Sequence, residues 1–300
     1  MSRLGTIAAV AETLSYSPSS VSVQLAQLER EAGAKLLRRV GRNVEMTAAG
    51  RRLAAYAAEA LAADEAMRSE LASAGDAPRG RLRMTFVQTP ALALLPGVMD
   101  RPAETAPDLQ VEVVQSETAP ALNDLRSQAV DLVVGIEYDP VPVSRQRDVD
   151  RRDLMREDVL LALHPDHGAA TKRGPIRLAG CEHAAWASGH RGTGLDAVVR
   201  NVCNRLGGFE PDIRHRSDDG LVLSALVTSG RAVALLPALL ATAMPQITAR
   251  RLRDERLQRT IFTATRVTAT EAPAVLAVRD SLLHTARQLA ARQRNLEVLP

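Results

Sequence analysis

Apolar positions recur at helical spacing in two neighbouring segments near the start of the chain, residues 6–14 and 17–32. The second segment opens with Ser17, whose hydroxyl can cap the N–H groups of a first helical turn, and Pro18 suits the first helical position. Gly33 follows, and glycine adopts the left-handed conformation that ends many helices. The sequence therefore predicts two short helices joined by a tight turn, which is the helix-turn-helix pattern.

The second of these helices carries short polar side chains on the face opposite its apolar edge. Short side chains let a helix enter a DNA major groove, where Ser and Gln can hydrogen-bond base edges or phosphates. Taken alone, the pattern also fits an ordinary amphipathic surface helix, so the flanking sequence decides between the two. The DNA contacts that we expect from this helix come from Ser17, Ser19, Ser20, Ser22, Val23, Gln24 and Gln27.

A basic hairpin is predicted directly after this helix, with two short strands around a turn-forming cluster. We expect Arg38, Arg39 and Arg42 in this hairpin to contact phosphates, because cationic side chains beside the groove neutralise them. Residues 30–52 include seven basic and two acidic side chains, a net charge of +5, whereas the whole chain carries only +3. Positive charge concentrated in this way is typical of a nucleic-acid-binding module.

A long Ala-rich helix is predicted from Ala48 to about Ser73, with Thr47 as its N-cap. A helix of this length cannot bury its apolar stripe against the small domain before it, so a second copy of the chain is the natural partner. We therefore expect a homodimer or homotetramer. The apolar stripe consists of Leu53, Tyr56, Ala57, Ala60, Leu61, Met67 and Leu71.

From about residue 81 to the end of the chain, strand and helix patterns alternate, which indicates a parallel α/β sheet. A linker-like stretch at 74–80 precedes them. The predicted strands are 81–87, 109–115, 130–136, 159–163, 184–188, 212–216 and 232–235, with a strand-rich tail at 252–265. The predicted helices begin near 90 and span 119–128, 194–206, 221–229 and 272–294.

Ligands of such sheets bind at the carboxyl ends of strands, near helix N-termini. The loop 188–193 is polar and glycine-rich, so its N–H groups suit an anion with Arg191 as counter-charge, although an ordinary surface loop fits equally well. Thr89 fits both a helix N-cap and a ligand donor. The effector-binding candidates selected by this rule are Gln88, Thr89, Glu137, Ser188, Arg191 and Asp218.

The segment from Thr6 to about Leu71 resembles the DNA-binding domain and linker helix of the LysR-type transcriptional regulators. The resemblance implies a sequence-specific DNA-binding regulator controlled by a small effector, often an anionic metabolite in this family, with double-stranded DNA as a partner. The matching motifs are Ala8-Ala-Val-Ala-Glu12 with Leu14, Tyr16-Ser-Pro-Ser-Ser-Val-Ser22 with Gln24, Leu25-Ala-Gln-Leu-Glu-Arg-Glu31, Gly33, Leu36-Leu37, Arg39, Gly41-Arg42 and Thr47-Ala-Ala-Gly50.

The same resemblance, which extends more loosely over nearly all of the chain, implies an α+β multi-domain fold. It comprises an N-terminal winged helix-turn-helix, a long linker helix and a two-lobed α/β effector-binding domain of the periplasmic-binding-protein type. The implied division is 1–46 for the DNA-binding domain, 47–75 for the linker and dimerisation helix, 76–80 for the hinge and 81–300 for the effector-binding domain. Lobe I takes about 81–153 and 251–300, and lobe II about 154–250.

The resemblance also exposes a departure at the start of the chain. Members of the family usually begin with a further helix before the segment that starts here at Thr6, and only Met1–Gly5 precede it. That helix normally packs beneath the helix-turn-helix. An alternative therefore stays open, in which the chain is an effector-binding dimer that has lost DNA binding through N-terminal truncation.

Composition and the remaining motifs exclude several other classes. Only seven aromatic residues are present, which disfavours stacking-based readers of RNA or single strands. Cys181 and Cys203 are isolated, which suggests a reducing compartment, and no signal peptide or membrane-spanning run is visible, so we expect a cytoplasmic protein with no membrane partner. His164-Pro-Asp-His167 and Cys181-Glu-His183 lack the further ligands of a metal site. With neither a nucleophile-elbow nor a Walker motif, we expect no catalysis and no cofactor.

Overall fold

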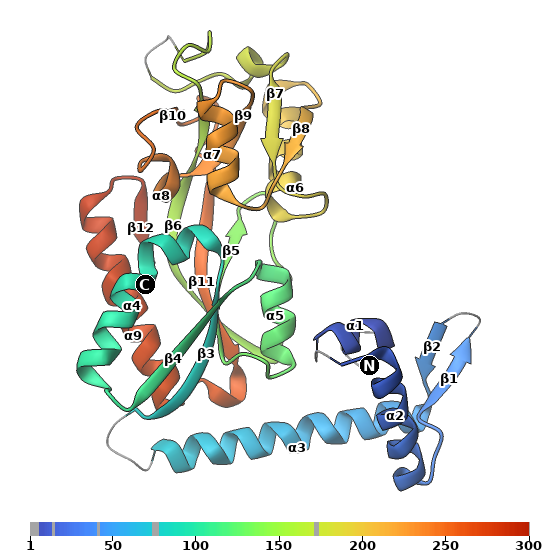
Figure 1. Cartoon of the computed structure of the whole chain (residues 1–300). Helices are drawn as coiled ribbons and strands as arrows, with labels where there is room; N and C mark the ends of the chain where they lie inside the picture. Colours follow the sequence, from blue (N-terminus) through green and yellow to red (C-terminus); the bar gives the residue numbers. More distant parts are fainter. Residues whose placement is uncertain (1–5, 14–15, 41–42, 74–77, 171–173, 300) are drawn as a thin grey trace.

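The computed structural model of the chain describes residues 6–13, 16–40, 43–73, 78–170 and 174–299. Its N-terminal part is a winged helix-turn-helix, and the long helix α3 leads from this head to the remainder of the molecule (Figure 1). The elements of this part are α1 (Ile7–Thr13), α2 (Pro18–Ala32), β1 (Leu37–Val40), β2 (Asn43–Met46) and α3 (Ala48–Ser73).

Local sequence signals fix the ends of α2 as expected. The Ser17 hydroxyl accepts a hydrogen bond from the Ser20 N–H at 3.1 Å, and Gly33 adopts φ 62° and donates to the Arg30 carbonyl. Val21 is buried in a small core shared with α1. Leu28, which shares the predicted apolar face, is instead 41% exposed, because the core of this small domain does not extend as far as the last turns of α2.

A mixed sheet with ten strands in the described residues runs through both lobes of the larger part, in the order β4-β3-β5-β11-β6-β9-β7-β8, with β10 and β12 also paired to β6. Lobe I contains the parallel strands β3, β4 and β5, and lobe II contains the parallel strands β7, β8 and β9. The bounds are β3 (Gly80–Phe86), β4 (Leu109–Gln115), β5 (Leu132–Tyr138), β6 (Val149–Leu163), β7 (Ala185–Ser188), β8 (Asp212–Arg216), β9 (Val233–Pro237), β10 (Thr248–Arg250), β11 (Gln258–Arg266) and β12 (Leu296–Val298).

Helices cover this sheet in both lobes (Figure 1). Lobe I has α4 (Gln88–Thr105), α5 (Thr118–Arg126) and α9 (Pro273–Arg292), and lobe II has α6 (Gly194–Val202), α7 (Gly220–Thr228) and α8 (Ala238–Ala241). The expected helix 194–206 continues past α6 as a π-helical turn, Cys203–Gly207. In the described part of the chain, no helix has the length and apolar character needed to cross a membrane.

The two lobes are joined by the strands β6 and β11, which lie antiparallel to each other. The chain enters lobe II along β6 and returns along β11, after which α9 packs against α4 and completes lobe I. This is the crossing that the family resemblance implies. The sequence pattern located only the second half of β6, because its first half, Val149–Glu157, is rich in charged residues that pair with neighbouring side chains.

Candidate nucleic-acid interface and ligand cavity

The polar face of α2 projects away from the rest of the head. The side chains expected to face DNA are exposed, and Val23, an apolar side chain, is 64% exposed on the same surface. The Ser17 hydroxyl is engaged as the helix cap, and the Gln27 amide donates to Glu31 at 2.9 Å. The exposed set is Ser17, Ser19, Ser20, Ser22, Val23, Gln24 and Gln27.

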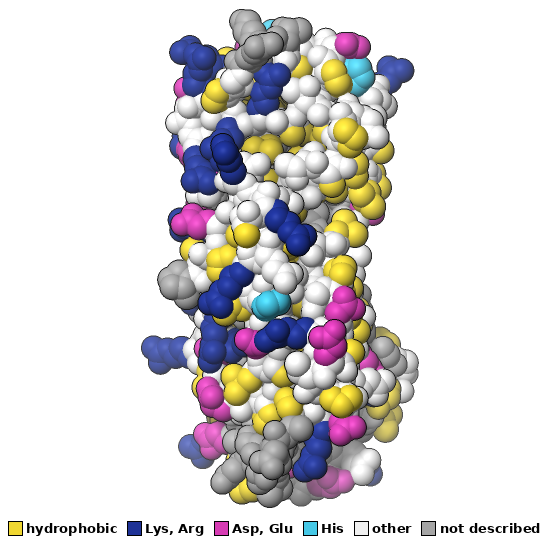
Figure 2. All heavy atoms as spheres, turned by 90° about the vertical axis from the view of Figure 1, so that its left-hand side faces the viewer, with side chains coloured by type: hydrophobic (Ala, Val, Ile, Leu, Met, Phe, Trp, Pro, Cys, Tyr) yellow, Lys and Arg dark blue, Asp and Glu magenta, His cyan; other side chains and the backbone are white. Residues whose placement is uncertain are grey.

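The wing β1–β2 presents its cations to solvent beside this helix. Arg38 and Arg39 are exposed, and Arg38 forms an ion pair with Glu45 at 3.0 Å. Arg42 lies outside the described residues. On the side of the molecule where α4 and α9 lie, basic and acidic side chains are interspersed (Figure 2). In the sequence, the excess of positive charge is concentrated in residues 30–52, which carry +5 compared with +3 for the whole chain.

Glu29, near the end of α2, fixes the wing relative to the helix. Its carboxylate accepts hydrogen bonds from the N–H groups of Leu36 at 2.9 Å and Leu37 at 3.0 Å, and it pairs with Lys35 at 2.8 Å. The Lys35 ammonium and the two backbone donors lower the Glu29 pKa from 4.5 to about 2. This role of Glu29 was not predicted, although an acidic residue beside a strongly basic stretch is a sequence signal for such a pairing.

A second joint connects the wing to α3. The Thr47 N–H donates to the Leu36 carbonyl at 2.9 Å, and the Thr47 hydroxyl donates to the Lys35 carbonyl at 2.7 Å. The same hydroxyl caps α3 by accepting from the Gly50 N–H at 3.0 Å. Gly50 is buried at this joint, and a Cβ there would collide with the Leu36 carbonyl oxygen, so the close approach requires glycine. The two joints make the head and the start of α3 one structural unit.

A cavity of about 490 Å³ lies between the lobes, at the carboxyl ends of β3 and β5 and the N-termini of α4, α6 and α7. Of the six effector-binding candidates, Gln88, Thr89, Glu137 and Asp218 line it. Ser188 is fully buried beneath it, and the exposed Arg191 is not among the lining residues. The topology therefore brings together four side chains from three distant parts of the sequence.

The glycine-rich loop 188–193 binds a carboxylate of this chain itself. The His190 N–H donates to Asp218 Oδ1 at 3.1 Å, and the His190 ring Nδ1 lies 2.8 Å from Asp218 Oδ2. The backbone donor and imidazole that an anionic ligand would use are therefore engaged by an internal anion. The anion site on the other groups of this loop, with Arg191 as counter-charge, stays a prediction.

Gln88 bridges the two lobes behind the cavity. Its amide N–H donates to Asp219 Oδ1 at 2.8 Å, and its amide oxygen accepts from the Gly220 N–H at 2.7 Å. Asp219 in turn caps α7 through the Leu221 N–H at 2.7 Å. Both hydrogen-bonding ends of Gln88 are thus used to hold lobe I against lobe II.

Arg259 on β11, which is not among the predicted effector-binding residues, also lines the cavity. It is 2% exposed, pairs with Glu157 at 2.7 Å and donates to the Thr89 hydroxyl at 2.6 Å. Glu157 also accepts from the Leu239 N–H at 2.6 Å, so this pair connects both lobes. No local motif could identify Arg259, because it reaches the cavity only through the return of the tail into the sheet.

Two carboxylates approach the cavity from opposite lobes. Glu117 precedes α5 in lobe I, and Asp218 precedes α7 in lobe II. Burial raises the pKa of Glu117, and repulsion by Asp218 raises it further, whereas Arg259 acts in the other direction. Glu137 is already paired with Arg151, and Arg259 with Glu157. The carboxyl groups that a ligand meets here are therefore Glu117, whose raised pKa favours its neutral form, and Asp218, which is hydrogen-bonded to His190.

The histidine and cysteine motifs have structural roles. His164 Nδ1 accepts the Asp166 N–H and His167 Nδ1 accepts the Ala169 N–H, each at 3.2 Å, as in a turn. Cys181 and Cys203 are buried free thiols in the core of lobe II. No group of three potential metal ligands occurs among the described residues.

A winged helix-turn-helix, a long linker helix and a two-lobed domain with an interlobe cavity define a ligand-responsive DNA-binding regulator. The family model "LysR substrate binding domain" matches residues 75–287, and "Bacterial regulatory helix-turn-helix protein, lysR family" matches residues 1–51. The chain belongs to the LysR family of transcriptional regulators. Members of this family are regulators rather than enzymes; they bind DNA and small-molecule effectors and form oligomers. The helix-turn-helix match favours a DNA-binding regulator over the truncated alternative.

Individual relatives agree with this assignment. A probable hydrogen peroxide-inducible genes activator of Mycobacterium xenopi is 35% identical over 163 residues, which cover 54% of this chain and 84% of the relative. A full-length OxyR variant from Pseudomonas aeruginosa has the same fold, with a TM-score of 0.65 and 19% identity over 94% of this chain and 90% of that chain. Full-length CbnR complexed with its target DNA matches at a TM-score of 0.56 and 21% identity, over 94% of each chain.

Proposed function

We propose that α2 binds in the DNA major groove and that the wing contacts the flanking phosphates. In this arrangement Ser19, Ser22, Val23 and Gln27 face base edges, because they share the exposed side of a helix whose other side is packed on α1. Ser17, Ser20 and Gln24 lie at the edge of this surface. The observation that carries the proposal is the rigid joint through Glu29, which holds a basic wing beside that exposed face.

Salt dependence of DNA binding tests these roles. The probe is a DNA duplex from the region upstream of the chain's own gene. Its affinity is measured by fluorescence anisotropy between about 50 and 200 mM salt, because proteins that contact several phosphates lose roughly a thousandfold in DNA affinity over this range. Each of R38Q and R39Q should lower the slope of log K against log salt by about 0.9. The matched control, R214Q, changes an exposed arginine of lobe II and should leave the slope unchanged. Equal slopes in all four proteins would refute the assigned phosphate contacts.

We infer further that the effector in the interlobe cavity is neutral or cationic, not the anion that the family resemblance suggests. Glu117 and Asp218 both line the cavity as hydrogen-bond acceptors, and the His190 N–H and imidazole of loop 188–193 are already engaged by Asp218. A ligand that brings an ammonium group or hydrogen-bond donors satisfies both carboxylates and draws the lobes together. Amine and carboxylate isosteres, n-butylammonium and butyrate, provide the probes.

The charge preference is tested by calorimetric titration of the full chain and of E117Q. Binding of n-butylammonium that weakens by about tenfold in E117Q supports the inference, since a charge-assisted hydrogen bond contributes roughly 1.5–3 kcal/mol. The A119W variant adds bulk at an exposed residue that lines this cavity and should abolish the same binding. Binding of butyrate alone, lost in A119W, would contradict the assignment.

The names of several relatives raise hydrogen peroxide as a signal, and the cysteines of this chain bear on that question. Reaction with peroxide requires an accessible thiolate. Burial raises the pKa of the Cys181 thiol to about 11. Burial and the neighbouring Cys181 raise the pKa of the Cys203 thiol to about 12. Both side chains are inaccessible to solvent. We propose that the effector of this chain acts by reversible binding and not by oxidation of these thiols.

Self-association is proposed to occur through α3. Tyr56, Leu61 and Met67 on this helix are 67%, 49% and 53% exposed, an apolar surface that a second copy would cover.

Two free thiols and a DNA partner fit a protein of the cytoplasm, where thiols stay reduced. The domain division expected from the sequence is retained as part of the proposal, with β6 passing through both lobes.

A further inference from the structure

Val23 is an apolar side chain at the centre of the surface that α2 turns away from the rest of the head. It is 64% exposed, whereas Val21, two residues earlier, is 4% exposed in the core shared with α1. Two positions along an α-helix correspond to roughly 160° around its axis, so Val23 points almost directly away from that core. Ser19 and Gln27 lie one turn before and one turn after Val23 on the same surface.

The polar side chains beside Val23 already form hydrogen bonds within the helix. The Ser22 hydroxyl donates to the Pro18 carbonyl at 2.9 Å, so its remaining capacity is that of an acceptor. The Gln27 amide donates to Glu31 at 2.9 Å. These polar groups can exchange partners when DNA binds, but a valine offers apolar contact alone. Base discrimination at the position of Val23 therefore depends on apolar contact and shape.

The sequence around Val23 lacks the side chains that most often read guanine. Arg and Lys read guanine through O6 and N7 in the major groove, but neither occurs between Ser17 and Leu28. Arg30 is the first cation that follows, roughly 10 Å further along the helix axis than Val23. Apolar side chains in the major groove contact the C5-methyl group of thymine instead. The chemistry of this part of α2 therefore favours an A·T pair.

The position and stiffness of Val23 both suit such a contact. The N-terminal residues of a recognition helix contact base edges, and Val23 lies in the second turn of α2. Branching at Cβ leaves valine one strongly preferred rotamer in a helix, so its methyl groups have a fixed direction before DNA binds. Ser19, Ser22 and Ala26 around it are small and exposed, and they leave room for a base pair to approach.

We propose that Val23 is a specificity-determining residue of the DNA interface, and that it packs against the C5-methyl group of one thymine in each half-site. The inference rests on the proposed placement of α2 in the major groove and adds the base that one of its side chains reads. Burial of one methyl-sized group against an apolar partner changes affinity by roughly fourfold, so each such thymine methyl should contribute a factor of about that size.

Removal of single methyl groups from the DNA tests the proposal without changing the protein. A duplex selected from a random library by the full chain serves as the probe. Each thymine, with its symmetry mate, is replaced by deoxyuridine, which keeps the hydrogen-bonding groups of the base pair and lacks only the methyl group. Affinity is measured by fluorescence anisotropy at constant salt. We expect one thymine in each half-site at which the parent loses roughly fourfold in affinity per methyl group.

The variant Val23→Ala connects that loss to this side chain. Val23 is exposed, so a shorter side chain leaves the packing of the head intact. V23A should bind the thymine duplex more weakly than the parent, and deoxyuridine at the same positions should cost it almost nothing. The matched control is S22A, which changes the exposed neighbour of Val23. S22A should keep the parental ratio between the thymine and deoxyuridine duplexes.

The possible failures separate this inference from the placement of α2. If the parent binds a selected duplex but tolerates the loss of every thymine methyl group, the inference is overturned and major-groove binding by α2 stands. Equal losses in the parent and V23A overturn it as well, because another side chain then contacts the methyl group. If no sequence is enriched in the selection, both the placement of α2 and the role of Val23 are overturned.

Discussion

The joint between the wing and the linker helix gives the sharpest stability prediction, through the substitution Gly50→Ala. Gly50 lies in the first turn of α3, buried against the wing. An added Cβ would collide with the Leu36 carbonyl oxygen and lie 3.0 Å from the carbonyl carbon, both of them backbone atoms. Because backbone cannot rotate away as a side chain can, the wing must move from α3 to accommodate the methyl group.

The magnitude follows from what this movement breaks. Two hydrogen bonds, from the Thr47 N–H to Leu36 and from the Thr47 hydroxyl to Lys35, hold the wing at this point. Each contributes about 0.5–1.5 kcal/mol, and overpacking costs about 1–3 kcal/mol more. Ala gains roughly 1 kcal/mol over Gly from helix propensity. The net loss is about 1–5 kcal/mol in the free energy of opening the joint, which corresponds to roughly five- to several-thousandfold faster exchange.

Hydrogen exchange over residues 34–50 measures this opening directly, and DNA affinity should fall together with it. Gly168→Ala is the matched control, because a Cβ at Gly168 meets no atom within 4 Å, and it should leave exchange in the head and DNA affinity unchanged. If G50A kept parental exchange rates and parental DNA affinity, the close approach of Gly50 to the wing would not be a constraint, and the reasoning would fail.

Three further predictions concern pH, thiol reactivity and lobe closure. Because the Glu29 pKa is lowered to about 2, the stability that its carboxylate gives the head is fully present above about pH 4.5 and is lost as pH falls toward 2. The stability difference between the parent and E29Q, measured by hydrogen exchange of residues 34–40, should therefore shrink over that pH interval. A stability difference that does not change with pH would contradict this prediction. Cys181 and Cys203 should react with Ellman's reagent only after unfolding; rapid reaction in the native protein would contradict their burial. Gln88→Ala removes two interlobe hydrogen bonds, worth about 1–3 kcal/mol together, and should increase the radius of gyration in small-angle scattering, whereas an unchanged radius would show that other contacts hold the lobes.

The head could be predicted closely from the sequence because its signals are local. Ser17, Pro18 and Gly33 act within a few residues of the helix ends that they determine, and the ends of α2 and α3 lie where the sequence placed them. The exposure of Leu28 was not predictable in this way, since it depends on how far a neighbouring helix extends. Glu29 was missed for a similar reason, because its partners are backbone groups of the following hairpin.

The interlobe cavity was predictable only in part. The rule that ligands bind at the carboxyl ends of strands found Gln88, Thr89, Glu137 and Asp218, because those positions lie at or just after strand ends. The rule could not show that the Gln88 side-chain amide is hydrogen-bonded to Asp219 and Gly220 of the other lobe, since these residues lie about 130 positions further along the chain.

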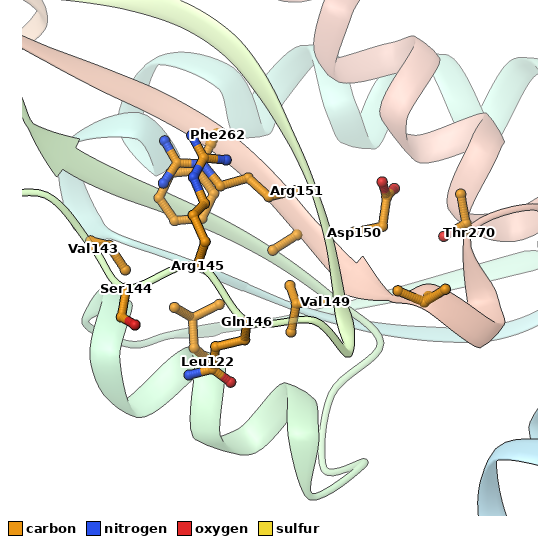
Figure 3. Close-up of a pocket in the computed structure, with 12 residues that line it drawn as sticks. Leu122, Val143, Ser144, Arg145, Gln146, Val149, Asp150, Arg151, Phe262 and Thr270 are labelled. Atoms are coloured by element: carbon orange, nitrogen blue, oxygen red, sulfur yellow. The ribbon is translucent and has the colours of Figure 1, made fainter. Parts of the chain in front are cut away.

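The sequence by itself determined the class of protein and the helical framework of the head, because caps, turns and hydrophobic periodicity act over short distances. It also determined where positive charge is concentrated. The tertiary structure decided the chemistry of the interlobe cavity. Arg259 reaches the interlobe cavity, and Arg151 meets Phe262 in lobe I (Figure 3), only because β6 and β11 pair antiparallel and return the end of the chain to its middle. The charge that a ligand meets is set by these long-range pairings, and no short segment encodes them.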